Sequence, residues 1–313
     1  MNPALALWFE ARLFVGRVGE LGLFENMDVV AHNRAAWNKE SKAGSRWCQA
    51  VTTDEIAAAR QGIWSVILTP NRSVPSGWFG NVKGKKVLCL ASGGGQQAPI
   101  LAAAGANVTS FDNSDEQLAK DRSVAERDSL ALHTVRGDMV NLSAFDDESF
   151  DLIFHPVSNV FAENLEPVWK ECFRVLKWNG SLLSGFMNPL YFLFDHTEAE
   201  KTGVLQVKYS LPYSDLKSLS EERKEKITKA GLAYEFGHTL EQQIGGQLAA
   251  GFVICDLYED GWDDKATPLN KFTSLYVSTL ARKCRFEPDG AAIGSQPNRS
   301  ETNRMTPTAG SHR

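Results

Sequence analysis

The sequence predicts an α/β fold: a seven-stranded, mostly parallel sheet with helices on both faces, a helical N-terminal extension and an insertion after the fifth strand. Two observations support this prediction. From residue 85 onward, short apolar runs alternate with helical stretches, a rhythm typical of βαβ units. Three consecutive glycines, Gly93 to Gly95, separate the first apolar run from the first of these helices, as in strand-to-helix turns that approach a ligand closely.

The apolar runs define the parallel part of the sheet. Five strands are expected, at residues 87–91, 108–111, 132–135, 150–154 and 181–186. Helices are expected between them, at residues 99–105, 115–128 and 166–176. Ser114 and Gln117 have the spacing of a capping box that opens the second of these helices. Right-handed crossovers bring the carboxyl ends of the strands to one edge of the sheet, where ligands bind in such folds.

The segment before residue 85 has a different texture and is predicted to be a helical extension or lid, residues 1–84. Helices are expected at residues 28–44 and 52–62, the second opened by a capping box of Thr52 and Glu55. A short strand is expected at residues 65–69. Four tryptophans fall in this region, Trp37, Trp47, Trp64 and Trp78. Packing against the next domain is favoured for them over lining a pocket.

After the fifth strand the βαβ rhythm stops. Residues 187–238 are interpreted as an insertion covering the site, and the charges of its helix at 220–231 as a solvated face. A helix then begins near Thr239, with Gln242 completing a capping box, and strands are expected at residues 253–259 and 272–282. The main domain is therefore residues 85–283. Residues 284–313 hold too few large apolar side chains to order themselves, and a disordered tail is expected.

Composition narrows the class of function. The net charge of -5 argues against a domain built to hold a nucleic-acid backbone, so no nucleic-acid partner is expected. The five cysteines are scattered without metal-ligand spacing, so no metal site is expected, and a reducing, cytoplasmic location is favoured. The N-terminus lacks the pattern of a signal peptide, and no stretch is apolar enough to span a membrane. The oligomeric state cannot be inferred.

The glycine loop and two acids indicate a nucleotide-like ligand. Asp112 ends the second strand nineteen positions after Gly93, near the interval at which a carboxylate reaches ribose hydroxyls. Asp138 follows the third strand, where its carboxylate could accept a hydrogen bond from an adenine amine. Gly93, Gly95 and Ala98 also satisfy the dinucleotide pattern G-x-G-x-x-G/A, so a nicotinamide cofactor remains open on these glycines alone.

With these residues in place, the sequence resembles the class I S-adenosylmethionine-dependent methyltransferases, whose fold is Rossmann-like, and within them a small-molecule branch of the type 11/25 kind. The resemblance covers about residues 85–282. It is carried by VLCLASGGG, by FDNS with Asp112, by GDM with Asp138, by FDLIF, and by RVLKWNGSLL, which is similar to the family's RVLKPGG turn. Cys89 and Ala91 stand where the family commonly has an acid and the first glycine, and Trp178 replaces the proline of the turn.

The resemblance implies S-adenosyl-L-methionine as cofactor and a set of residues around it. The implied cofactor-binding residues are Ala91, Ser92, Gly93, Gly95, Asp112, Asn113, Gln117, Asp138, Met139 and His155. The acid that the family commonly has at the position of Cys89 helps to fix the glycine loop. An adenine contact is expected from Asp138 and from the backbone of Met139, and a ribose contact from Asp112.

Methyl transfer is an in-line displacement, so alignment and exclusion of water are the main tasks of the protein. His155, after the fourth strand, is the candidate general base, and its alternative role is to position the backbone beside the cofactor. The candidate substrate residues are Ser158, Asn159, Tyr209, Tyr213 and His238. The family's D/N-P-P-Y/F motif for nucleic-acid amines is absent after the fourth strand, where the chain reads HPVS, so a small organic acceptor is expected.

Two other functions remain open at this point. An NAD(P)-dependent oxidoreductase would use the glycine pattern but leaves Asp138 and the KWNG turn unexplained. A catalytically silent, cofactor-binding regulatory protein is suggested by Cys89 and Ala91.

Overall fold

The computed structural model describes residues 27–262 and 266–285. The expectations for residues 1–26 and for 286–313 of the tail lie outside this part of the chain. The main sheet has seven strands in the order β3-β2-β1-β4-β5-β9-β8. Its strands are β1 Lys86–Leu90, β2 Asn107–Asp112, β3 Leu132–Arg136, β4 Phe150–His155, β5 Leu176–Met187, β8 Val253–Asp260 and β9 Tyr276–Arg282. Strands β1 to β5 are parallel, and β9 runs antiparallel between β5 and β8.

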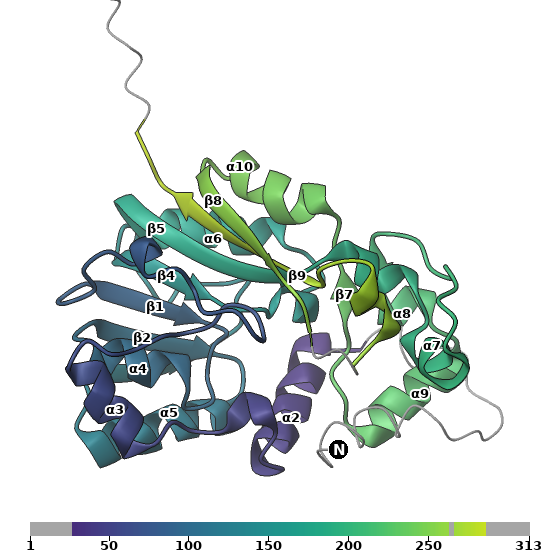
Figure 1. Cartoon of the computed structure of the whole chain (residues 1–313), viewed down its shortest axis with the longest axis horizontal. Coiled ribbons are helices and arrows are strands. Elements are labelled where there is room, and N and C mark those ends of the chain that lie inside the picture. Colours follow the sequence, from purple (N-terminus) through teal and green to yellow (C-terminus); the bar gives the residue numbers. More distant parts are fainter. Residues whose placement is uncertain (1–26, 263–265, 286–313) are drawn as a thin grey trace, which may run out of the picture.

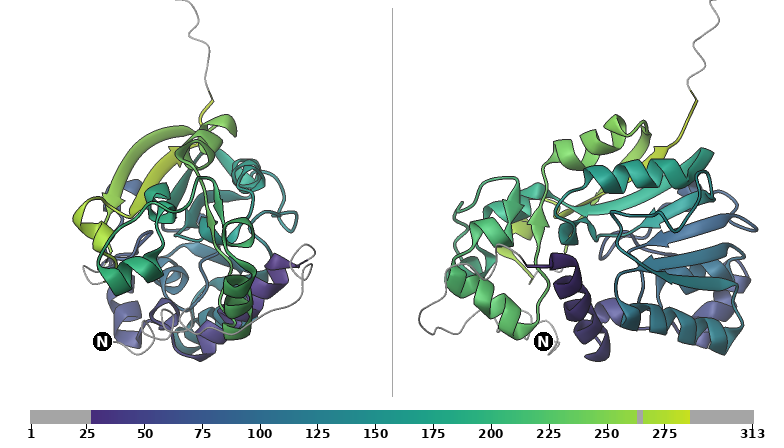
Figure 2. Two further views of the ribbon diagram at one scale, coloured as in Figure 1. Left: turned by 90° about the vertical axis from the view of Figure 1, so that its right-hand side faces the viewer. Right: turned by 180° about the vertical axis from the view of Figure 1, so that it is seen from behind.

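Helices cover both faces of this sheet, as the sequence predicts (Figures 1 and 2). Strand β1 shows why. Val87 and Cys89 belong to a core shared with α3 and α4, whereas Leu88 and Leu90 belong to the core under α6. Successive side chains of a strand point to opposite faces, so a continuous apolar run requires cover on both sides. The helices are α2 Val29–Lys42, α3 Thr53–Arg60, α4 Gln97–Ala103, α5 Asp115–Asp128, α6 Glu166–Val175, α7 His196–Thr202, α8 Asp215–Ser218, α9 Glu221–Ala230 and α10 Gly246–Ala249.

Local signals set the helix ends, and the structure differs from the sequence prediction at one helix start and in one expected strand. The capping box of Thr52 and Glu55 is present at the start of α3. At α5, Ser114 Oγ accepts from the Gln117 amide at 3.2 Å, but the Gln117 side chain does not complete the box. The strand expected at residues 65–69 is wrong: this segment makes one isolated bridge, Ile67 to Ser73, because it passes over the sheet instead of joining it.

The segment between β5 and β8 forms a smaller body beside the sheet, seen at the right of Figure 1. It contains α7 to α9 and a two-stranded sheet of β6 Tyr213–Ser214 and β7 Phe236–Gly237. It has its own apolar core, which includes Ile227, Tyr234 and Phe236. Helix α2 bridges this body and α5: Asn33 exchanges two hydrogen bonds with the backbone of Tyr234, and Asn38 Oδ1 accepts from Ser114 Oγ at 2.7 Å.

A buried ion-pair cluster fixes the insertion from within. Asp195 is 8% exposed and its carboxylate lies 2.7 Å from both Arg223 and Lys208. Burial alone would raise the pKa of Asp195, but hydrogen bonds from Arg223 and Lys208 hold this pKa well below its ordinary value. The charged side chains of α9 are therefore not all solvated, because Arg223 points inward to Asp195 and Lys224 is only 6% exposed.

No helix within residues 27–262 and 266–285 combines the length and the apolar character needed to cross a bilayer.

Replacing Asp195 with asparagine is expected to lower the free energy of unfolding by about 2 kcal/mol, because Arg223 then loses its charged partner in a half-buried place. Urea denaturation measures this. Since the folded-state pKa is depressed, the stabilisation is present above about pH 4 and is lost as the pH falls, so the difference between wild type and variant should shrink there. The control Glu225→Gln, in an exposed pair with Lys229, should change stability by less than about 0.5 kcal/mol.

Candidate active site

The glycine loop between β1 and α4 is tied down by its own backbone amides. The Gly93 N–H donates to Asp112 Oδ2 at 3.0 Å, and the Gly95 N–H donates to Asp121 Oδ1 at 2.7 Å. Between them, the Gly94 N–H donates to the carbonyl of Gln117 at 3.1 Å. The acceptors belong to the end of β2 and to α5, so three consecutive amides anchor the loop to one neighbouring strand–helix unit.

Absence of a side chain is what allows this close approach. A Cβ on Gly93 would lie 2.8 Å from the Cβ of Gln117, and one on Gly95 would lie 2.8 Å from the Cβ of Ala50. The loop is thus squeezed between α5 and residues 47–50 of the N-terminal segment. Because its three amides already donate to protein acceptors, the loop offers no row of free N–H groups to a pyrophosphate. This geometry does not support the nicotinamide alternative.

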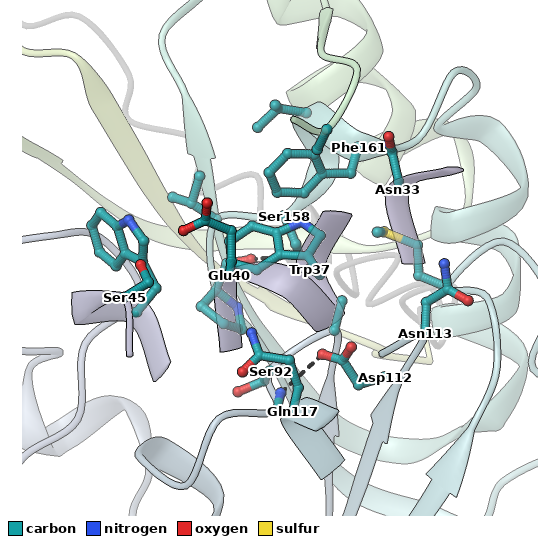
Figure 3. A pocket seen from close by; sticks show the side chains of 18 of the residues that line it. Asn33, Trp37, Glu40, Ser45, Ser92, Asp112, Asn113, Gln117, Ser158 and Phe161 are labelled. Carbon is teal, nitrogen blue, oxygen red and sulfur yellow. Dashed lines mark hydrogen bonds between the residues drawn. The ribbon is translucent and has the colours of Figure 1, made fainter. Parts of the chain in front are cut away.

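A cavity of about 290 Å³ opens beside the loop. One side is formed by the ends of the parallel strands, with Ala91, Ser92, Asp112 and Asp138. The opposite side is formed by α2, by residues 67–70, by residues 156–161 after β4, by the insertion and by β9. Figure 3 shows Asp112 beside Ser92 and Gln117, with Trp37 and Phe161 across the cavity.

Two carboxylates, those of Asp112 and Asp138, lie on the first side of the cavity. Asp112 accepts from the amides of Gly93 and Ser114, at 3.0 and 2.8 Å, while burial raises its pKa above the ordinary value. Asp138 accepts from the amide of Val140 at 3.2 Å, and burial likewise raises its pKa. Met139, Asn113 and Gly137 line the cavity next to them. The structure confirms that these residues lie together at one edge of the sheet.

Among the residues described, buried polar atoms without partners lie on both sides of the cavity, including Trp262 Nε1 on the opposite side and two atoms on the side of the loop. Within the described part of the chain, Ser92 Oγ and Gln117 Oε1 are buried and accept or donate no hydrogen bond. Such atoms are costly unless a ligand or water satisfies them. Both side chains line the cavity, so the residues present suit a polar ligand that runs past the loop towards Asp112.

The opposite side is apolar and aromatic. Trp37 and Phe161 meet edge to face with ring centroids 5.2 Å apart. The further apolar and aromatic lining residues are Val30, Ile67, Leu68, Pro70, Val157, Val160, Met187, Tyr191, Leu232, Trp262 and Tyr276. Glu40, Glu235 and Arg46 also line the cavity. This wall suits a compact apolar molecule with one or two polar groups.

The expectation that His155 faces the cavity is wrong. Its side chain is 0% exposed, with Nδ1 3.0 Å from the Leu90 carbonyl and Nε2 2.7 Å from Asn159 Oδ1. Burial lowers the pKa of His155, whereas the contacts with Leu90 and Asn159 act to raise it. His155 therefore joins β4 to β1, and its ring has a main-chain partner, as the alternative role requires.

Other predicted residues are also placed away from the cavity. Asn159 donates to Gln243 Oε1 at 2.8 Å, and His238 Nε2 contacts the carbonyls of Asn159 and Ala162, so both serve the same buried network. Tyr209 and Tyr213 line a smaller hollow of about 40 Å³ in the insertion. The structure therefore does not support a contact between these four residues and an acceptor, because their side chains lie outside the lining of the main cavity. Ser158 does line the main cavity.

Several cavity residues escaped the sequence analysis. Packing was expected for the tryptophans, which is right for Trp64 and Trp78 but wrong for Trp37 and Trp47, which line the cavity. Arg46 and Glu235 carried no motif, although Arg46 neighbours Trp47 and stacks on its ring, with its guanidinium 4.5 Å from the centroid.

Comparison with known proteins agrees with the fold and the loop. Residues 88–184 match a family described as a methyltransferase domain. A Bacillus subtilis protein, "Uncharacterized methyltransferase YbaJ", is 56% identical over 232 residues, covering 74% of this chain and 91% of that protein. The sterol 24-C-methyltransferase erg6 of Aspergillus fumigatus is 39% identical over 105 residues, which is 33% of this chain and only 28% of that protein. An S-adenosylmethionine-dependent methyltransferase from Mesorhizobium loti shares the fold, with a TM-score of 0.52 at 18% identity, over 66% of this chain and 94% of that chain.

A seven-stranded sheet with this strand order, an anchored glycine loop and acids after the second and third strands define a Rossmann-like methyltransferase domain. The chain belongs to the class I S-adenosylmethionine-dependent methyltransferases.

Ala91 offers a test of the loop's backbone. It holds φ at +48°, a left-handed conformation that costs an alanine about 1–2 kcal/mol, at the position where the family commonly has glycine. Ala91→Gly relieves this strain but gives the unfolded chain more freedom, so a net gain of roughly 0.5–1 kcal/mol in unfolding free energy is expected. Chemical denaturation measures it, with Ala57→Gly, in α3, as a control that should lose about 1 kcal/mol. A loss of stability in Ala91→Gly would contradict the strain assignment.

Proposed function

We propose that the chain binds S-adenosylmethionine in the main cavity and transfers its methyl group to a small, largely apolar organic acceptor. The observation that supports this most strongly is the two-sided cavity. One side presents the anchored loop, Asp112 and Asp138, and the other presents an aromatic wall from α2, the segment after β4 and the insertion. A cofactor and an acceptor can therefore meet in one enclosed space.

The residues proposed to hold the cofactor follow from that placement. Asp112 suits the ribose hydroxyls, Asp138 and the backbone of Met139 suit adenine, and Ser92 and Gln117 offer their unsatisfied atoms to the remaining polar groups. Ala91, Gly93 and Asn113 complete this side. We add Arg46, which lines the cavity, and propose its guanidinium as the partner of the cofactor's carboxylate. Gly95 and His155 are proposed to act behind the wall, as positioning residues.

When bound, the cofactor supplies an electrophilic methyl group on a sulfonium. The tasks left to the protein are to orient the acceptor towards that methyl and to keep water out. The edge-to-face pair of Trp37 and Phe161 and the buried side chains of Val160 and Leu232 can do both, because they enclose the acceptor in apolar surface. Ser158, which lines the cavity, is proposed as a polar contact of the acceptor.

The chain divides accordingly. We propose that residues 85–283 form the cofactor-binding domain, that residues 187–238 form its acceptor-side insertion, and that the segment before residue 85 acts as a lid through α2. This proposal is supported by the hydrogen bonds from α2 to Tyr234 on one side and to Ser114 on the other.

Asp112→Ala is expected to abolish binding of S-adenosylmethionine and S-adenosylhomocysteine and with it all methyl transfer. Thermal unfolding is the measurement: ligand at ~100 times its dissociation constant stabilises by about 2.7 kcal/mol, and this gain should vanish in the variant. The exposed Asp54→Ala serves as the control and should retain the full shift. A wild-type shift with NAD or NADP but with neither sulfur ligand would contradict the proposal, as would turnover by Asp112→Ala.

Trp37→Ala is expected to raise the KM for an apolar acceptor by at least tenfold while leaving S-adenosylhomocysteine binding within about threefold, because the lost ring faces the acceptor side. An acceptor panel read out by methyl transfer finds the substrate, and steady-state kinetics measure the change. Trp178→Ala, on β5 and outside the cavity lining, is the matched control. Equal loss of cofactor binding in Trp37→Ala would show that this wall does not serve the acceptor.

A further inference from the structure

Asp121 is a buried carboxylate that no motif of the sequence singled out. It lies on α5 and is 0% exposed. Its Oδ1 accepts from the Gly95 amide at 2.7 Å, and its Oδ2 accepts from Ser110 Oγ at 2.6 Å. One side chain therefore connects the glycine loop, strand β2 and helix α5.

Asp121 supplies a carboxylate close to a position in the first strand where the family commonly has an acid and this chain does not. Cys89 stands where the family commonly has a loop-fixing acid, and its side chain is 0% exposed. Burial raises the pKa of Cys89 well above its ordinary value, and the nearby charge of Asp121 adds to the rise. The space under the loop thus has a carboxylate, but it arrives from α5 and not from β1.

We propose that Asp121 is the positioning residue that holds the glycine loop in its cofactor-binding form, in place of an acid on the first strand, and that its ionised form does this best. Asp121 is absent from the cavity lining, so it acts through the Gly95 amide. The Gly95 carbonyl in turn accepts from the Val51 amide at 2.8 Å, which extends the effect to the N-terminal segment beside the cavity. This inference rests on the proposed binding of S-adenosylmethionine.

The electrostatic surroundings make this anchor sensitive to pH. Burial raises the pKa of Asp121 to about 7, against the hydrogen bonds from Ser110 and Gly95 that lower it. Of the charged groups that face it, Asp112 on β2 raises this pKa and Arg122 on α5 lowers it, while Cys89 on β1 stays neutral. A hydrogen bond to a charged acceptor is stronger than one to a neutral acceptor. The loop should therefore be held more firmly as the pH rises through about 7.

Asp121→Asn tests the charge with little change of shape, because its amide oxygen can still accept from Gly95 and its amide nitrogen can donate to Ser110. Calorimetric titration with S-adenosylhomocysteine is carried out from pH 6 to pH 8.5. The wild-type affinity should rise with pH relative to that of the variant, which should bind about tenfold more weakly at the upper end. Ser110→Ala removes one hydrogen bond that lowers the pKa of Asp121. In this variant the midpoint of the pH dependence of affinity should therefore lie at higher pH than in the wild type.

Two readouts in the ligand-free protein separate this role from simple structural support. The ¹⁵N-labelled Gly95 amide should titrate with a midpoint near the pKa of about 7 in the wild type and not in Asp121→Asn. Stability has the opposite sign to affinity: because the folded-state pKa is raised, the wild type should become less stable relative to the variant as the pH rises from about 4 to 7.

The outcomes distinguish this inference from the proposed function. Equal affinity and equal pH dependence in wild type and Asp121→Asn would overturn the inference while leaving S-adenosylmethionine binding intact. No binding by the wild type at any pH would contradict the proposed function and, with it, the link between Asp121 and the cofactor, even if the Gly95 amide titrates.

Discussion

The three amide hydrogen bonds of the glycine loop are the interactions on which the site depends. They hold the loop against Asp112, the Gln117 carbonyl and Asp121, and thereby fix the position of one side of the cavity. The N-terminal segment then packs directly on the loop, with the Trp47 carbonyl 2.9 Å from where a Cβ of Gly94 would lie. Because α2 precedes that segment, the position of the opposite wall also follows from the loop.

Charge in the cavity is consistent with a cationic cofactor. The lining carboxylates of Glu40, Asp112, Asp138 and Glu235 outnumber the single guanidinium of Arg46 among the lining residues described. Burial raises the pKa of both Asp112 and Asp138, so bringing a positive charge near them lowers the cost of keeping them ionised. A dianionic pyrophosphate would have the opposite effect. The electrostatics and the occupied loop amides therefore point to the same class of ligand.

The cofactor side could be predicted from the sequence because its parts are local. A strand, a glycine turn and an acid at the next strand end follow each other within the segment 85–114, and periodicity alone places them at one edge of the sheet. The acceptor side could not be predicted in the same way. Only the segment after β4, with Ser158, was marked by the sequence; the other residues come from α2, from residues 67–70, from the insertion and from β9, which only tertiary packing brings together. The sequence signals that were read there, Tyr209 and Tyr213, belong to the core of the insertion instead.

The burial of His155 bears on the chemistry as well as on the prediction. A polar residue after the fourth strand is a reasonable candidate for a base, but its two ring nitrogens are spent on Leu90 and Asn159. Leu90 is the last residue of β1, directly before the glycine loop, so the ring supports the loop from beneath. A displacement at a sulfonium methyl needs alignment more than proton transfer. The hydrogen bonds from the loop to Asp121 on α5 and from Leu90 to His155 on β4 suit a site that works by such alignment.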